Sequence, residues 1–182
     1  FPAVGTSCMV PGNGNALWFC SAQGLVLRQG SRTTLYTIDY GLPSNDVRAL
    51  SVDARGGVWI GTKGKGVTYY RRGRWKYQRG LRGRDIRAFV KGRGKTLYSI
   101  SFLNGVEMYA KRKWRSLGLG IAGNTIRVIR VAPDDSVWVG TTSGVSRYKD
   151  GRWTNCADAL PALDIRACAV DPAGAVWIGT YG

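Results

Sequence analysis

The stretch Val58-Trp59-Ile60-Gly61-Thr62 decides the fold of this chain, because it recurs along the sequence. Its clearest repeats are Val137-Trp138-Val139-Gly140-Thr141 and Val176-Trp177-Ile178-Gly179-Thr180. Weaker copies occur at Leu17-Trp18-Phe19-Cys20-Ser21 and Leu97-Tyr98-Ser99-Ile100-Ser101. The aromatic residues stand at positions 18, 59, 98, 138 and 177, with successive spacings of 41, 39, 40 and 39 residues. A period of this length indicates stacked copies of one supersecondary unit.

Each repeat contains four short apolar or alternating runs separated by turn residues. In the second repeat these runs are Val47–Val52, Val58–Thr62, Val67–Tyr70 and Trp75–Gln78. Gly, Asp and Asn between the runs supply the backbone conformations that tight hairpins need. No segment has helical apolar spacing over a useful length. Four short antiparallel strands per repeat predict an all-β fold, a β-propeller of four-stranded blades.

The chain is predicted to hold about four and a half blades of a single propeller. The blades are placed approximately at residues 1–43, 44–82, 83–122 and 123–161, with a partial blade at 162–182. A leftover half-blade does not fit into a closed four-bladed ring. We therefore expect either a fragment of a larger ring, with the remaining blades elsewhere in a longer chain, or self-association, because open blades expose unpaired strand edges.

The recurring aromatic residues are expected to form the structural core, filling the wedges between neighbouring blades. A ligand-stacking role is the alternative. These residues are Trp18, Trp59, Tyr98, Trp138 and Trp177 in the second run of each repeat, and Trp75, Trp114 and Trp153 in the fourth.

The chain has four cysteines and no histidine. Histidine is the commonest general base and metal ligand, so neither a catalytic residue nor a metal site nor a cofactor is expected. Cys8 and Cys20 flank the turn near Asn13-Gly14 at equal distances, where a disulfide between opposed strands is possible. Two small buried thiols are the alternative. Cys156 and Cys168 fall on an outermost and an innermost strand and are not expected to pair.

The stretch Gly41-Leu42-Pro43-Ser44-Asn45-Asp46-Val47, followed by Val58–Thr62 and Gly66-Val67, resembles the two-component regulator propeller repeat. The resemblance covers nearly the whole chain, and the third repeat departs most because Tyr98 replaces the tryptophan. Residues that match the family's D-x-x-G-x-[LV]-W string are Asp53, Gly56 and Trp59 in the second repeat, and Asp171, Gly174 and Trp177 in the fifth.

This resemblance implies a ligand-sensing domain from the periplasmic or extracellular part of a bacterial receptor. Such domains precede a transmembrane helix and a signal-transduction output domain, and many of them bind glycans. No apolar run in this chain is long enough to span a bilayer.

The charge balance is strongly basic, with 27 Lys and Arg against 11 Asp and Glu, a net charge of +16. That charge can attract anionic glycans, lipid headgroups or nucleic acid. A solvated basic surface is the alternative, because the positive charges are interpreted as spread over the whole chain.

Four arginines recur directly after the apolar residue that opens the innermost strand of a blade: Arg48, Arg87, Arg127 and Arg166. Hairpin topology predicts that Lys63 and Lys65, in the glycine loop of the second repeat, share that face. We expect a positive ring around the funnel that binds an anionic or glycan ligand. The alternative is that each arginine ties blades together by pairing with Asp46, Asp85 or Asp164.

The leading functional hypothesis is therefore a recognition or sensor propeller rather than an enzyme. A protein–protein interaction propeller without a small-molecule ligand is the alternative. A lyase or hydrolase ranks last, because propeller lyases of the streptogramin-cleaving kind depend on histidine.

Overall fold

The computed structural model describes residues 5–102, 104–156 and 160–182, so the first four residues of the first predicted blade and residues 157–159 of the fourth lie outside the description. Within the described residues, eighteen strands form five antiparallel sheets. One short 3-10 helix, η1 (Ile38–Tyr40), accompanies them. The predicted all-β architecture of four-stranded blades is confirmed.

Each full sheet keeps its strands in chain order. The first is β1 (Thr6–Pro11), β2 (Ala16–Ser21), β3 (Gly24–Gln29), β4 (Arg32–Tyr36). The second is β5 (Val47–Val52), β6 (Val58–Thr62), β7 (Gly66–Arg71), β8 (Arg74–Tyr77). The third is β9 (Ile86–Lys91), β10 (Leu97–Ser101), β11 (Gly105–Ala110), β12 (Lys113–Ser116). The fourth is β13 (Ile126–Val131), β14 (Val137–Thr141), β15 (Gly144–Lys149), β16 (Arg152–Asn155), and β17 (Asp164–Val170) pairs with β18 (Val176–Tyr181).

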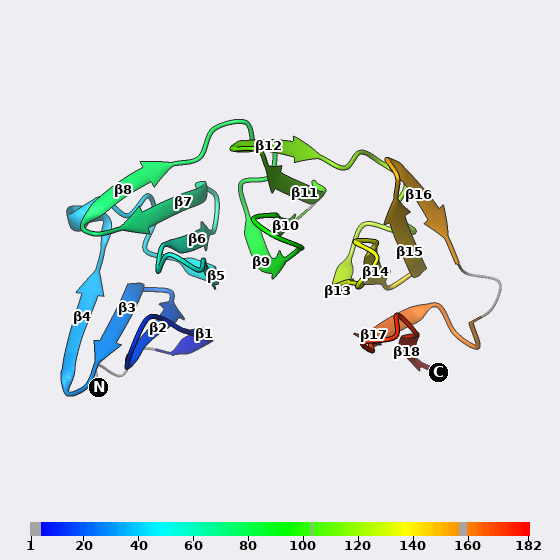
Figure 1. Ribbon diagram of the computed structural model, residues 1–182, viewed down its shortest axis with the longest axis horizontal. Helices are drawn as coiled ribbons and strands as arrows, with labels where there is room; N and C mark the ends of the chain where they lie inside the picture. The colour runs from blue at the N-terminus through cyan, green and yellow to red at the C-terminus, as the bar shows by residue number, and fades with distance from the viewer. Residues whose placement is uncertain (1–4, 103, 157–159) are drawn as a thin grey trace.

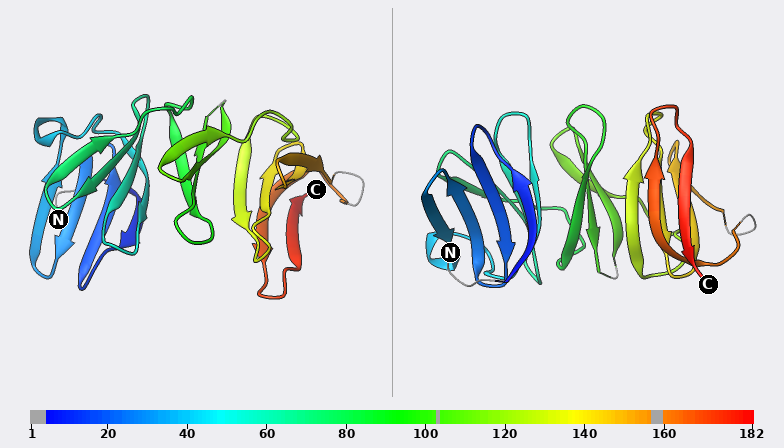
Figure 2. Two further views of the ribbon diagram at one scale, coloured as in Figure 1. Left: turned by 45° about the horizontal axis from the view of Figure 1, so that its top comes forward. Right: turned by 90° about the horizontal axis from the view of Figure 1, so that it is seen from below.

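The five sheets stand side by side in an open arc (Figure 1). The first strand of each four-stranded sheet lies on the concave side and the fourth strand on the convex side. Figure 2 shows the strands running between two opposite faces of the arc. We call the face with the blade-to-blade connections and the loops between second and third strands the loop face, and the opposite one the turn face.

Adjacent blades interlock through the glycine of the repeated motif. A Cβ atom built on Gly61 would lie 2.5 Å from Cγ2 of Ile86, the first residue of the next innermost strand. Gly140 has the same relation to Ile165, also at 2.5 Å. The glycine is therefore needed because the next blade packs directly against the backbone at this point.

The motif aspartate fixes the turn between the first two strands of a blade. Asp53 accepts hydrogen bonds from the backbone N–H groups of Arg55 (2.8 Å) and Gly57 (2.9 Å). Its other carboxylate oxygen accepts a hydrogen bond from the Tyr69 hydroxyl at 2.8 Å, across the sheet. Asp171 repeats the arrangement by accepting from the backbone N–H of Ala175 at 2.8 Å. The motif aspartate therefore stabilises the turn by accepting hydrogen bonds from its backbone N–H groups.

Most of the predicted aromatic core is inside the molecule. Trp18, Trp59, Tyr98 and Trp114 are buried, and Trp59 touches Tyr109 and Trp114 of the next blade, with ring centroids 4.6 and 6.0 Å apart. Trp75, Trp138 and Trp153 are partly buried.

The prediction is wrong for Trp177, which is 67% exposed. Trp177 lies on the face of β18 that corresponds to the face of β6 covered by the third blade. No described residue forms a sheet against that face of β18, so the indole stays in solvent.

The first blade carries a cross-strand disulfide. Cys8 and Cys20 are register partners in β1 and β2, and their sulfur atoms are bonded. Cys156 and Cys168 are free thiols.

Candidate functional site

The loop face brings the start of each innermost strand beside the loop that follows the second strand. The backbone N–H of Lys63 donates to the carbonyl of Asp46 at 2.9 Å, and that of Phe102 donates to Asp85 at 2.9 Å. Thr142 donates to Thr125 in the same way at 3.3 Å. The expected proximity of the Lys63 loop and the innermost strand is therefore present.

Each predicted arginine is the extra residue of a β-bulge. In β5, Val47 pairs with Thr62 and Ala49 pairs with Gly61, which leaves Arg48 without a partner in the ladder. The same register shift isolates Arg87, Arg127 and Arg166 in their blades. A bulge redirects the side chain at its extra residue, so the repeated fold itself presents these arginines at one position in four blades.

Three of the four arginines are paired with a carboxylate two residues earlier in the same strand region. Arg48 holds Asp46 in a bidentate pair, Nε–Oδ1 2.8 Å and Nη2–Oδ2 2.9 Å. Arg87 donates to Asp85 at 3.0 Å, and Arg166 donates to Asp164 at 2.6 Å. These pairs lie within single blades, so the expectation of inter-blade ties is wrong for these three arginines.

Arg127 differs from the other three because Thr125 occupies the position of the aspartate. Its nearest carboxylate is Asp164 of the next blade, 4.0 Å from Nε. Arg127 is therefore the one bulge arginine of the described chain whose ion pair crosses a blade boundary.

A basic cluster forms on the loop face between the second and third blades. The backbone N–H of Gly66 donates to the carbonyl of Arg84 at 2.8 Å, which joins the loop of Lys63 and Lys65 to the loop of Arg82 and Arg84. These four cationic side chains are exposed. Together with Arg48 and Arg87 of the adjoining bulges they make up what we call the loop-face cluster.

The buried Glu107 side chain holds the loop of Arg82 and Arg84 in place. The Glu107 side chain is fully buried and accepts hydrogen bonds from the backbone N–H groups of Arg82 (2.7 Å) and Gly83 (3.0 Å). Because the carboxylate binds backbone rather than guanidinium groups, the arginine side chains stay available on the surface. Sequence reasoning missed Glu107, Arg82 and Arg84.

The cationic side chains of the loop-face cluster also lower the pKa of the neighbouring Asp46. The hydrogen-bonded Arg48 guanidinium holds the pKa of Asp46 below its usual value, and the nearby charges of Lys63 and Arg87 lower it further. Asp46 therefore remains ionised and neutralises only part of the positive charge.

The positive charge is concentrated, contrary to the even spread inferred from the sequence. Residues 44–122, the predicted second and third blades, contain 19 Lys and Arg against 4 Asp and Glu, which is 19 − 4 = +15 of the net +16. A charge count per repeat would have found this from the sequence.

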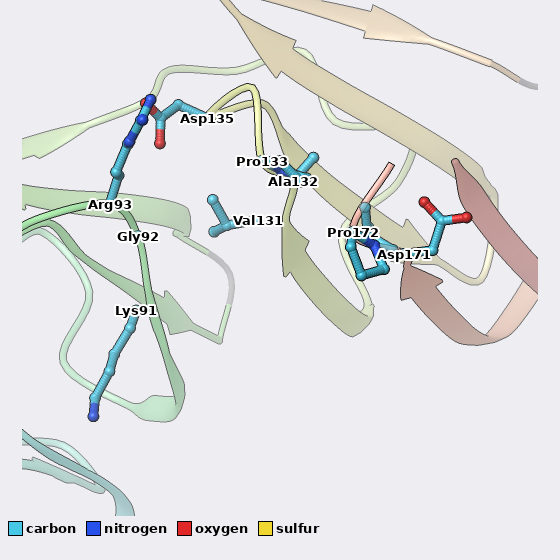
Figure 3. Close-up of a pocket in the computed structure, with 10 residues that line it drawn as sticks. Lys91, Gly92, Arg93, Val131, Ala132, Pro133, Asp135, Asp171 and Pro172 are labelled. Atoms are coloured by element: carbon cyan, nitrogen blue, oxygen red, sulfur yellow. The ribbon is translucent and has the colours of Figure 1, made fainter. Parts of the chain in front are cut away.

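Two hollows line the concave side of the last three sheets. One, of about 420 Å³, lies along the middle of β9, β13 and β17 and is bordered by Arg127 and Arg166. The other, of about 460 Å³, lies on the turn face. In Figure 3, Arg93 and Asp135 lie together at one edge of the second hollow and Asp171 at the other.

Comparison with known families now gives a direct match. Residues 41–64, which hold the connection to β5, the first bulge and the Val58–Thr62 motif, match the two component regulator propeller family. Residues 41–64 are therefore similar to a two-component regulator propeller repeat. The resemblance inferred from the sequence is confirmed over these residues. No curated protein sequence matches the chain significantly.

Solved structures support the same fold. The extracellular domain assigned to a hybrid two component system of B. thetaiotaomicron is 26% identical, with a TM-score of 0.76 over 100% of this chain and 26% of that one. A second such domain is 19% identical, with a TM-score of 0.76 over 97% of this chain and 27% of that one. This chain therefore spans about a quarter of each.

Virginiamycin B lyase from Staphylococcus aureus also shares the fold, at 16% identity and a TM-score of 0.76 over 96% of this chain and 63% of that one. A sequence identity of 16% supports a shared fold only. The described residues contain no helix long and apolar enough to cross a membrane. The part of the chain that the structure describes also holds no group of three or more metal-ligating side chains.

Proposed function

We propose that this chain is the recognition part of a bacterial sensor and that its loop-face cluster binds an anionic ligand, with anionic glycans as the leading class. The observation that carries the proposal is the clamped pair of basic loops, which Glu107 and the Gly66–Arg84 hydrogen bond hold next to each other. Because the backbone of these loops is already held, anion binding has to order only the cationic side chains and not the loops.

The family match and the extracellular domains among similar structures support a periplasmic or extracellular sensor role. The chain spans about a quarter of those domains. That it is part of a receptor with an output module, and that the receptor binds such ligands, is therefore part of this proposal.

The test uses dextran sulfate, with neutral dextran as the probe that lacks charge. Binding to the sulfated polymer should weaken as salt rises, because it releases counterions. The variants Lys63→Gln/Lys65→Gln and Arg82→Gln/Arg84→Gln should each weaken it by about tenfold or more. The matched control Lys113→Gln/Arg115→Gln removes two charges from the exposed outer strand of the third blade.

Equal losses in the control and in the loop variants would mean that overall charge, not the loop-face cluster, binds the polymer. A short duplex DNA as competitor separates a general polyanion surface from one that prefers glycans.

A protein-interaction role is a second candidate, favoured by the distribution of exposed apolar side chains. Among the described residues, seven of the nine large exposed hydrophobic side chains lie on the loop face. Aromatic residues combined with arginine are typical of protein interfaces. A partner that is lost with Leu119→Ser/Leu163→Ser, while dextran sulfate binding is unchanged, would favour this candidate. The seven residues are Ile38, Tyr40, Tyr77, Phe102, Leu119, Leu163 and Tyr181.

A further inference from the structure

The concave side of the third, fourth and fifth sheets carries a hollow that the loop-face cluster does not use. Its walls are consecutive segments of three innermost strands, residues 88–90, 127–130 and 166–168. The turn-face hollow continues along the same three strands at residues 91–93, 131–133 and 170–172. The two hollows therefore lie end to end along the inner wall of the arc.

Arg127 borders this hollow, and its guanidinium has no close partner. Among the described residues its guanidinium makes no hydrogen bond, and its one ion pair is the 4.0 Å contact with Asp164. Arg166 donates to Oδ2 of Asp164 at 2.6 Å, and the Oδ1 atom that faces Arg127 accepts no hydrogen bond. The side chain of Arg127 is 40% exposed, so a ligand can reach it.

The substitution of the aspartate explains why the Arg127 guanidinium has no hydrogen-bonded carboxylate in its own blade. In the second blade, both carboxylate oxygens of Asp46 bind one edge of the Arg48 guanidinium, through Nε and Nη2. Thr125 has the equivalent place before Arg127 and offers no carboxylate. The four bulge arginines face three such aspartates, and the missing one is at the hollow.

The rest of the wall is largely apolar. Phe89, Val128 and Ile129 line the hollow beside Arg127, and Arg130, also at its border, is exposed. A volume of about 420 Å³ is within the range of small-molecule sites, which combine an apolar lining with a few polar groups.

We propose that this hollow binds a small organic anion, with a carboxylate on Arg127 and an apolar body against the strand wall. A guanidinium with no hydrogen bond can offer its planar fork to a carboxylate in the way Arg48 does to Asp46. The site is separate from the loop-face cluster, so either proposal can fail while the other stands.

The test is an NMR titration with benzoate, with benzamide as the neutral probe of the same shape. Benzoate should bind the unaltered chain and benzamide should bind much more weakly. Arg127→Gln should reduce the affinity for benzoate by about ten- to a hundredfold. Thr125→Asp should reduce it similarly while keeping every arginine, because it supplies the carboxylate found in the other blades.

Matched controls are Arg152→Gln and Thr154→Asp on the exposed outer strand of the same blade, which make the same charge changes away from the hollow. Both controls should keep benzoate affinity, and all four variants should keep the melting temperature within a few degrees. No benzoate binding, equal binding of benzamide, or unchanged affinity in both Arg127→Gln and Thr125→Asp would overturn the proposal. If one of these two unfolds, the other still decides.

Discussion

Arg48, Arg87 and Arg166 each have a carboxylate two residues earlier, whereas Arg127 has Thr125 there. A repeated residue thus has different chemistry in successive blades because its immediate partner changes. The aspartate of the first turn behaves alike in the two blades that have it. Asp53 and Asp171 both accept backbone N–H groups, whereas Gly12, Gly92 and Ala132 have the equivalent position in the other blades.

At this scale we predict that the Asp53–Tyr69 pair stabilises the fold in a pH-dependent way. Burial alone would raise the pKa of Asp53, but hydrogen bonds from Tyr69, Gly57 and Arg55 outweigh it and lower the pKa. A carboxyl with a lowered folded-state pKa stabilises above its unfolded value of about 3.9, and this contribution is lost as pH falls through the folded-state pKa.

Tyr69→Phe should therefore reduce the free energy of unfolding by about 1.5–3 kcal/mol at pH 7. The difference from the unaltered chain should shrink as the pH approaches 2. Urea unfolding at both pH values measures this, with the exposed Tyr40→Phe as the control. A difference that stays constant with pH would contradict the role of the ionised carboxylate.

At the scale of elements, neighbouring blades meet through glycine and a β-branched side chain. Gly61 receives Ile86, and Gly140 receives Ile165. Gly179 occupies the same motif position in β18, but the nearest atom to a Cβ built there is Ala167 Cβ, at 3.3 Å. The next blade therefore packs against this motif position in two blades, whereas in β18 the nearest atom belongs to the same sheet.

We predict that Gly61→Ala and Gly179→Ala have different costs. Gly61→Ala forces a methyl group into Ile86 and should lower the free energy of unfolding by about 1–3 kcal/mol, the range for overpacking. Gly179→Ala should lower it by less than Gly61→Ala does, because Ala167 Cβ at 3.3 Å has to move by only a few tenths of an ångström. Chemical denaturation of both variants provides the comparison. Equal costs would mean that backbone conformation, not the packing of the next blade, requires the glycine.

At the scale of the whole molecule, the arc has an uncovered sheet at each end (Figure 1). Met9 on β1 is 60% exposed and Trp177 on β18 is 67% exposed. The net positive charge is concentrated in the second and third blades, because residues 44–122 carry +15 of the net +16. Each end of the arc thus exposes a large hydrophobic side chain, while the middle is cationic.

We predict that this 182-residue chain self-associates through its end sheets. Light scattering at rising concentration should give a mass above the 19.8 kDa of one chain. Trp177→Lys should shift the equilibrium towards the monomer, because it places a charge on the uncovered face. Tyr40→Lys changes an equally exposed aromatic residue on the loop face and should leave the mass unchanged. A monomer that persists at every concentration would refute this prediction.

The sequence alone determined the repeat, the strand pattern and the blade architecture. These follow from features inside one repeat: alternating apolar runs, turn glycines and aspartates, and the Val58–Thr62 motif. The bounds of β5 and β6 agree with the runs read from the sequence because local backbone preferences fix them. The sequence also predicted that four recurring arginines lie at the start of the innermost strands.

Tertiary structure decided everything that depends on contacts between segments far apart in the chain. The bulge at each arginine arises from the register between two strands, which no single run encodes. The exposure of Trp177 depends on whether another sheet covers it. The environment of Arg127 depends on Asp164, a residue of the next blade whose Oδ2 binds Arg166 and whose Oδ1 lies 4.0 Å from Arg127. A periodic sequence specifies each blade, whereas the neighbours of that blade decide which copies of a repeated residue are left free to bind.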